Sequence, residues 1–317
     1  MPVDLSAEPA SVAMPAGCPG PTCTSIGLTP VSDLEDGEYR GLQGGLYCGS
    51  NQPPAAYAAK GVALGNAIVP RDAAGAPDPD GKYAMVSIGM SHTTMEFSAF
   101  IAKYQDNAQL DPHLVLVDGA LSGHTTVAWL DPANEVWSNL GNRLSARGVS
   151  DAQVAVAWVK LARKTPQEQC TLAGIDGPCF PAYEAPLAEE TRTILGMLRA
   201  RFPNLTLVYL ASRSYGGYAS SDLNPDPFAY GSAFAMKKLI VEGILDAPAA
   251  QGLPWLGWGP YLWADGTHPR SDGLTWSVDD FIEDGTHPGP SGREKVADAL
   301  FEHFHTDPTA TPWFVAP

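Results

Sequence analysis

Basic residues are scarce in this chain, and they nowhere form a run. The 317 residues include 19 Lys and Arg against 35 Asp and Glu, which gives a formal net charge of −16. Nucleic acids and anionic membrane surfaces attract basic patches and repel a chain with this balance. We therefore expect neither a nucleic acid nor a membrane among its partners, and the composition leaves the oligomeric state open.

Long hydrophobic runs are also missing. The longest apolar stretches fall far short of the roughly 20 residues that a membrane helix needs. The first residues lack the charged and apolar regions of a signal peptide, which is typical of a mature N-terminus given a new Met. Hydrophobic residues still make up 44% of the chain, as in globular proteins. We expect an extended arm, rich in Pro, Gly, Ala and Ser, over residues 1–30 and a single domain over residues 31–317.

The five cysteines form no C-x-x-C pair and have no histidine at zinc-ligand spacing. We therefore expect neither a metal nor another cofactor, although Asp272, Asp279 and Asp280 are either a calcium site or simply clustered exposed aspartates. Two disulfides and a free thiol indicate an oxidising compartment, so we expect a secreted or periplasmic protein. Cys170 and Cys179 bracket a short loop containing Gly and Pro, and we expect these two to pair.

What the chain does contain is an alternation of short apolar runs with helical patterns. Four runs have the length and flanks of buried strands: 83–88, 113–118, 153–159 and 205–210. Helical patterns cover residues 55–67, 134–147, 183–202, 228–245 and 292–304, and another begins near Thr94. Ser291 can cap the last of these helices. Strands and helices in alternation predict a parallel sheet covered by helices on both faces.

A short polar turn, containing Ser91, separates the first predicted strand from the helix that follows it. A serine at the carboxyl end of a parallel strand lies where ligands bind, and the free N–H groups of the helix favour developing negative charge there. Ser91 is therefore a candidate nucleophile. The alternative is that Ser91 or Thr93 simply caps the helix, and this local pattern does not decide between the two.

A second polar turn, FIEDGTHPGPSGREK, leads into the last predicted helix. Asp284 and His287 are three residues apart in it, so the carboxylate can bond one ring nitrogen and leave the other free to take a proton from a hydroxyl. A serine needs such a base to become a strong nucleophile. The same letters DGTHP occur earlier, with Asp265 and His268. We expect the later copy to be catalytic, because only it leads directly into an amphipathic helix that anchors its turn.

These turns and several other short blocks resemble those of the SGNH (GDSL-type) hydrolases, which are esterases and acetyl hydrolases with a Ser-Asp-His triad. The wider pattern is similar to secreted bacterial proteins of this type and spans roughly residues 30–315. The matching segments are GGLYCGSN, SIGMSHTT, VDGALSG, AWVKLA, SRSYGGYA, WGPYLWADG and DGTHPGPSGREKVA. The resemblance implies a flavodoxin-like three-layer α/β/α sandwich with a mostly parallel sheet.

The same resemblance assigns roles to single residues. Ser91 becomes the nucleophile, Asp284 and His287 the acid and base, and Gly123 an oxyanion donor beside the N–H of Ser91. Two positions depart from the family pattern: Met90 replaces the usual aspartate before the serine, and the third block contains no asparagine donor. Lys160 falls near that strand end and is either a cationic oxyanion donor or a surface lysine.

Further residues are candidates for the substrate pocket. His92 and His124 border the two oxyanion blocks. Arg213 ends the fourth predicted strand, where it either clamps an anionic group of a substrate or forms an ion pair within the fold. Aromatic residues crowd the segment PWLGWGPYLW, in which Trp263 is the substrate-binding candidate. These aromatics either stack on sugar rings or belong to the core, and the core interpretation is favoured.

The sequence thus predicts a secreted serine esterase that forms an acyl-enzyme at Ser91. The residues themselves support acyl transfer, while the resemblance implies acetyl or another short acyl group on a polysaccharide or small-molecule ester. The alternative is a carbohydrate-binding protein on a hydrolase scaffold with little or no catalysis, which Met90 and the missing asparagine suggest.

Overall fold

The computed structural model describes residues 24–47, 49–164, 166 and 183–317. At its centre lies a parallel sheet of five strands in the order β4-β3-β5-β6-β7. The strands are β3 (Tyr83–Gly89), β4 (Leu114–Asp118), β5 (Val154–Lys160), β6 (Leu207–Leu210) and β7 (Trp255–Trp258). Every residue of β3 and β5 is buried, which explains why they are continuous apolar runs rather than alternating ones.

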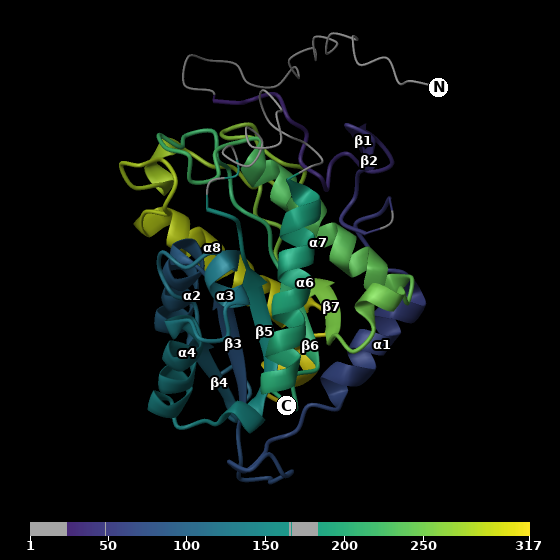
Figure 1. Ribbon diagram of the computed structural model, residues 1–317, viewed down its shortest axis with the longest axis vertical. Helices are drawn as coiled ribbons and strands as arrows, with labels where there is room; N and C mark the ends of the chain where they lie inside the picture. Colours follow the sequence, from purple (N-terminus) through teal and green to yellow (C-terminus); the bar gives the residue numbers. More distant parts are fainter. Residues whose placement is uncertain (1–23, 48, 165, 167–182) are drawn as a thin grey trace.

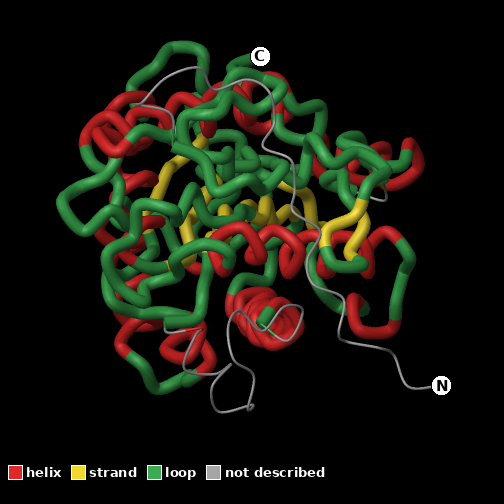
Figure 2. The backbone as a smooth tube through the Cα atoms, turned by 90° about the horizontal axis from the view of Figure 1, so that it is seen from above, coloured by secondary structure: helices red, strands yellow, loops and turns green. Residues whose placement is uncertain are grey.

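Helices cover both faces of this sheet, as Figure 2 shows in a view along the layers. The helices are α1 (Ala55–Asn66), α2 (Ser91–Tyr104), α3 (Thr126–Leu130), α4 (Glu135–Ala146), α6 (Glu184–Arg201), α7 (Phe228–Ile244), α8 (Pro290–Thr306) and α9 (Thr311–Phe314). On one face α2 packs against α8, and on the other α6 packs against α3 and α7 (Figure 1). The predicted three-layer α/β/α sandwich is confirmed.

Shorter elements complete the described chain. A two-stranded antiparallel hairpin joins β1 (Glu38–Tyr39) to β2 (Leu42–Gln43). Single 3-10 turns occur at η1 (Asp151–Gln153), η2 (Pro248–Ala250) and η3 (Val278–Asp280). The buried apolar side chains form one contiguous core that includes residues from β3, β5, β6, β7 and α8. All five cysteines, and with them the expected Cys170–Cys179 disulfide, lie outside the described residues.

Three details of the elements differ from the sequence predictions. Strand β7 was not predicted, because its letters WLGW lie between Gly and Pro and read as an aromatic cluster; these aromatics are buried, so the core interpretation is confirmed. Helix α2 begins three residues before Thr94. Helix α8 begins at Pro290 with Gly289 as its N-cap, while the Ser291 hydroxyl bonds a carbonyl of η3 instead of capping.

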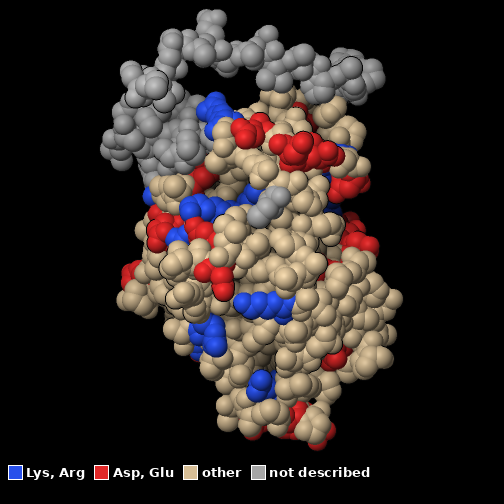
Figure 3. All heavy atoms as spheres, turned by 90° about the vertical axis from the view of Figure 1, so that its right-hand side faces the viewer, with Lys and Arg blue, Asp and Glu red and all other residues tan. Residues whose placement is uncertain are grey.

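The surface drawn in Figure 3 carries acidic and basic side chains interspersed, without a continuous basic field. Within the described ranges, no helix has both the length and the apolar character required to cross a bilayer.

Candidate active site

Ser91 occupies the first position of α2, immediately beyond the carboxyl end of β3. The chain turns between strand and helix at Gly89, where any Cβ would lie 2.1 Å from the hydroxyl of Thr93 and 2.4 Å from the carbonyl of Lys160. Met90, in an extended conformation, is the N-cap. Ser91 therefore does not cap the helix, and its hydroxyl is free for another partner.

That partner is His287, whose Nε2 lies 2.7 Å from the hydroxyl oxygen of Ser91. On the other side of the ring, Nδ1 lies 2.5 Å from a carboxylate oxygen of Asp284. Because an ionised carboxylate only accepts hydrogen bonds, Nδ1 carries the proton and Nε2 accepts from the serine hydroxyl. The three side chains thus form one chain of hydrogen bonds in the order Ser91, His287 and Asp284.

The turn that carries the acid and the base is held by its own backbone. The second carboxylate oxygen of Asp284 accepts the N–H groups of Thr286 and His287, at 2.9 and 2.8 Å. Burial alone would raise the pKa of Asp284, but the bonds from the His287 side chain and from these N–H groups outweigh it and lower the pKa. Asp284 therefore stays a carboxylate at neutral pH. Gly285 has φ of +63°, and a Cβ there would clash with the backbone of Tyr218.

Ser91 and His287 open onto a cavity of about 420 Å³, which we call the Ser91 pocket. Its described lining is Met90, Ser91, His92, Met95, Ser122, Gly123, Thr125, Lys164, Arg213, Leu223, Asn224, Thr286 and His287. Gly123 has φ of +80° and open space where a Cβ would be. Within the described part of the chain, neither its N–H nor that of Ser91 has an acceptor. The pocket lining therefore includes two residues whose backbone N–H groups have no described acceptor, one of them at a helix N-terminus.

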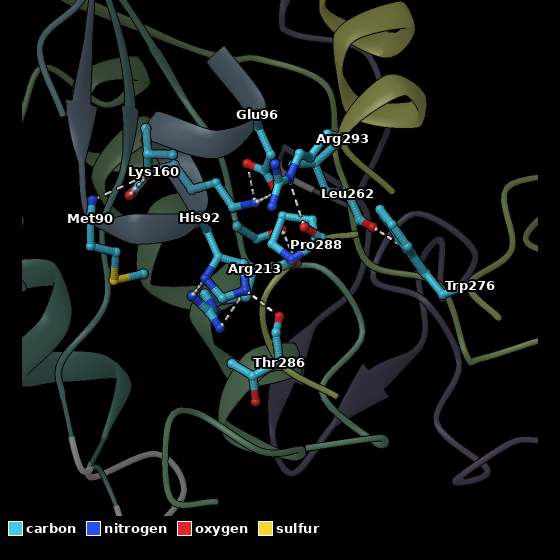
Figure 4. A network of polar contacts seen from close by, with 12 residues as sticks. Met90, His92, Glu96, Lys160, Arg213, Leu262, Trp276, Thr286, Pro288 and Arg293 are labelled. Atoms are coloured by element: carbon cyan, nitrogen blue, oxygen red, sulfur yellow. Dashed lines mark hydrogen bonds and ion pairs between the residues drawn. The ribbon is translucent and has the colours of Figure 1, made fainter. Parts of the chain in front are cut away.

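His92 lies beneath this pocket, stacked on His287 with 5.0 Å between ring centroids. Figure 4 shows His92 between Arg213 and the backbone of Thr286. Its Nε2 lies 2.5 Å from the carbonyl oxygen of Thr286 and must donate to it, so Nδ1 accepts from the Arg213 guanidinium at 2.9 Å. Burial, and then the charges of Arg213 and Lys160, hold the pKa of His92 well below its usual value. His92 is thus a neutral ring that links Arg213 to the turn containing Thr286 and His287.

Lys160 is not placed as an oxyanion donor. Its ammonium lies 2.7 Å from both carboxylate oxygens of Glu96, and both side chains are 0% exposed (Figure 4). Burial lowers the pKa of Lys160 to about 8, against the opposing effect of the Glu96 carboxylate. The side chain turns away from the Ser91 pocket because Glu96, on the inner face of α2, is its counter-ion. The sequence alternative of a surface lysine is also wrong.

His124 and Trp263 do not line the Ser91 pocket. His124 contacts the carbonyl of Ser122 and the carboxylate of Glu135. Trp263 is fully buried, and its indole N–H donates to Asp226 at 3.1 Å. Trp263 therefore belongs to the core, so its assignment to substrate binding is corrected.

The first DGTHP copy has a different surrounding from the second. Asp265 is buried, and its carboxylate accepts the backbone N–H groups of Ile26 and Gly27 and the hydroxyl of Ser25. It therefore ties the start of the described chain to the domain. His268 is not among the described residues that line the Ser91 pocket. Only the second copy reaches Ser91.

Among the described residues, no group of three or more His, Cys, Asp or Glu side chains could hold a metal ion. Of the aspartates considered for calcium, Asp272 pairs with Arg270, and Asp280 accepts from Lys295 at 2.6 Å. These ion pairs take up the carboxylates that a cation would need.

Sequence reasoning missed part of the pocket wall. Lys164 and Thr125 follow β5 and β4 by a few residues, so the rule that ligands bind beyond strand ends could have found them. Asn224 comes from an irregular loop, where its side chain accepts from the Tyr183 hydroxyl and donates to the carbonyl of Arg163. No local pattern around Asn224 points to this position.

Several solved structures are distantly similar to this chain. A candidate acylhydrolase from Bacteroides fragilis is 13% identical, with a TM-score of 0.41, over 79% of this chain and 96% of its own. A GDSL-like lipase from Bacteroides thetaiotaomicron is 12% identical, with a TM-score of 0.38, over 78% of this chain and 96% of its own. An acetylxylan esterase from Geobacillus stearothermophilus is 13% identical, with a TM-score of 0.36, over 70% and 93%. No family model and no curated protein matches the sequence.

Proposed function

We propose that this protein is a serine esterase of the SGNH type that forms an acyl-enzyme at Ser91. The observation that carries the proposal is the chain of hydrogen bonds from Ser91 through His287 to Asp284, with distances of 2.7 and 2.5 Å, at the mouth of a cavity. A nucleophile, a base within hydrogen-bond reach of it and a third group that orients the base are the parts that acyl transfer requires.

In the first half of the reaction, the oxygen of Ser91 attacks the ester carbonyl while Nε2 of His287 takes the hydroxyl proton. The carbonyl oxygen becomes an oxyanion, which the N–H groups of Ser91 and Gly123 can stabilise. Asp284 stabilises the imidazolium that forms and keeps its orientation. His287 then gives the proton to the departing alcohol, which leaves the acyl group on Ser91.

In the second half, a water molecule takes the place of the alcohol. His287 accepts a proton from this water as its oxygen attacks the acyl carbonyl, and the same N–H groups stabilise the second oxyanion. Collapse of this intermediate returns the proton to Ser91 and releases the carboxylic acid. Atoms balance as ester plus water giving alcohol plus acid.

The proposal includes a short acyl group, acetyl above all, carried by a carbohydrate or a similar alcohol, and a protein that acts outside the cytoplasm. The acyl and sugar preferences follow from the motif resemblance, and the location follows from the cysteine content and the acidic composition. The cavity of about 420 Å³ has room for a small ester group.

The test is hydrolysis of 4-nitrophenyl acetate together with labelling by a fluorophosphonate probe. The wild-type protein should be labelled at Ser91, and Ser91→Ala should lose turnover by about 10³-fold or more. Ser98→Ala, which removes an exposed serine of the same helix, is the matched control and should keep wild-type turnover. Glycan binding without labelling and without Ser91-dependent turnover would overturn the esterase and favour a carbohydrate-binding protein.

A further inference from the structure

The charge of the Ser91 pocket is opposite to that of the chain. The whole sequence carries 16 more acidic than basic residues, from 35 against 19. The described residues that line the pocket include two cations, Lys164 and Arg213, and no Asp or Glu. Asp284, the acid of the catalytic turn, bonds to His287 and is not part of this lining. A cationic pocket in an acidic protein is an arrangement that attracts an anion.

Arg213 is the more buried of the two cations, and most of its donors lack acceptors among the described residues. The residue is 4% exposed, and its buried Nε has no hydrogen-bond partner in the part of the chain that the structure describes. Its Nη1 donates to Nδ1 of His92, but its Nη2 faces Nε2 of the same ring, which already donates its proton to Thr286. A guanidinium offers five N–H donors and keeps its charge in proteins. Arg213 is therefore a buried cation whose donors the fold only partly satisfies.

The carboxylates close enough to influence Arg213 are Glu96, Asp226 and Asp284, and Glu96 acts most strongly. Asp226 accepts the N–H groups of Gly216 and Tyr230, and Asp284 bonds to His287. Both oxygens of Glu96 lie 2.7 Å from the ammonium of Lys160. Arg213 itself forms no ion pair in the part of the chain that the structure describes. Glu96 therefore neutralises Lys160, and no carboxylate of the described residues forms an ion pair with Arg213.

Lys164 stands at the rim of the same pocket. Its side chain is exposed and has no ion-pair partner among the described residues. Its neighbour Arg163 contrasts with it, because Arg163 pairs with Glu190 at 2.9 Å. One cation at the floor and one at the rim therefore face the cavity in which Ser91 and His287 meet.

We propose that Arg213 and Lys164 form an anion subsite within the Ser91 pocket, so that the preferred substrate is an ester carrying a carboxylate or another oxyanion. This inference rests on the proposed esterase function and names its substrate class. Arg213 supplies a planar set of N–H donors for the oxyanion, while Lys164 adds a mobile charge where the substrate enters. Arg213 also supports His92, and through it the catalytic turn, for neutral and anionic substrates alike.

The experiment compares esters that differ only in charge. On the alcohol side, 4-acetoxybenzoate is compared with 4-acetoxybenzamide; on the acyl side, mono-4-nitrophenyl adipate is compared with 4-nitrophenyl hexanoate. In at least one pair, kcat/KM of the wild type should favour the anion by roughly tenfold or more, because a charge pair near a protein surface can supply at least that much. The preference should shrink as salt is added, because ions screen Lys164.

The variants assign the preference to these two residues. Lys164→Ala should reduce the ratio several-fold and Lys164→Glu should reverse it. Arg213→Met should also reduce the ratio of kcat/KM between the anionic and the neutral ester. Any loss of activity that arises because His92 loses its support lowers kcat/KM for both esters of a pair, so it cancels in this ratio. Lys60→Ala, which removes an exposed lysine of α1 without a described ion pair, is the charge-matched control and should leave the ratio unchanged.

The outcomes separate the two proposals. Ser91-dependent hydrolysis of neutral and anionic esters at equal rates would overturn the anion subsite and leave the esterase intact. A preference that survives in both Lys164 variants and in Arg213→Met would overturn the assignment to these residues. Absence of any Ser91-dependent turnover would overturn the esterase itself. Because Lys164 is exposed, its variants keep the test decisive if Arg213→Met does not fold.

Discussion

The ion pair between Lys160 and Glu96 offers the sharpest test of how the site is built. Both side chains are 0% exposed, and the ammonium contacts both carboxylate oxygens at 2.7 Å. The motif resemblance puts an oxyanion donor near Lys160, whereas the geometry gives Lys160 a purely structural partner. Three variants distinguish these roles: Lys160→Met, Glu96→Leu and the double variant that carries both changes.

The expected magnitude follows from burial. Removing one member leaves the other as an unpaired charge in the core, which destabilises a protein by about 3–5 kcal/mol. For a domain of this size, about 2 °C of melting temperature corresponds to each kcal/mol, so each single variant should melt roughly 6–10 °C lower. The double variant leaves no buried charge and replaces the pair with apolar side chains of similar volume. Its stability should therefore return to within about 2 kcal/mol of the wild type.

The assay combines urea unfolding with ester hydrolysis at a temperature where all variants are folded. The double variant should keep kcat/KM within about tenfold of the wild type, because the Lys160 ammonium bonds to Glu96 and not to the oxyanion. Loss of one oxyanion donor lowers turnover by about 10²–10³-fold. A Lys160→Met protein of wild-type stability that has lost turnover to this extent would refute the structural role.

Three further predictions concern the proposed base His287, the buried carboxyl of Glu184 and the buried ring of His92. His287→Ala should lose esterase turnover by about 10³-fold or more with little change in melting temperature, whereas His268→Ala should keep most of it; the reverse in a 4-nitrophenyl acetate assay would show that the wrong copy was chosen. Burial raises the pKa of Glu184 to about 8 from an ordinary 4.5, so the folded chain holds a proton that the unfolded chain has lost, and stability should fall as pH rises between these values. Glu184→Gln should flatten that fall in unfolding experiments, and an unchanged slope would contradict the assignment. The lowered pKa of His92 gives the opposite pH dependence. As pH drops, the unfolded chain binds a proton at this histidine before the folded chain does, so stability should fall below about pH 6.5. His92→Gln should weaken this dependence, and an unchanged slope would count against the prediction.

The parts of the fold that the sequence predicts well are those whose signals are local. The four predicted strands agree with β3, β4, β5 and β6 to within about two residues, because fully buried parallel strands are continuous apolar runs. The hydrogen bond between Asp284 and His287 was also predictable, since the two residues are three apart in one turn. Strand β7 was not predicted, because a segment of four residues that includes a glycine is too short to give a periodic signal.

The residues whose positions were predicted wrongly from the sequence are those whose partners lie far away along the chain. Lys160 and Glu96 are 64 residues apart, and Trp263 and Asp226 are 37 apart. A lysine at a strand end and a tryptophan in an aromatic cluster each have surface and core interpretations that only the packing of other elements decides. No window along the sequence contains that information.

Helix α2 contains a residue that a local sequence signal identified, Ser91, and a residue whose partner lies far away along the chain, Glu96. Its first residue, Ser91, is the candidate nucleophile, and Glu96 lies on the buried side of the helix, where it neutralises Lys160 at the end of β5. The strand end at which the family pattern has an asparagine is therefore occupied by a neutral ion pair rather than by a free donor. The donors that we propose for an oxyanion are the N–H groups of Ser91 and Gly123, and the cations that line the pocket are Arg213 and Lys164. If Glu96 were absent, Lys160 and Arg213 would be two unpaired buried cations in one core. This would raise the free energy of the folded state. Glu96 thus neutralises Lys160, which is not part of the described pocket lining, whereas Arg213, which is part of it, is the cation that we propose for the anion subsite.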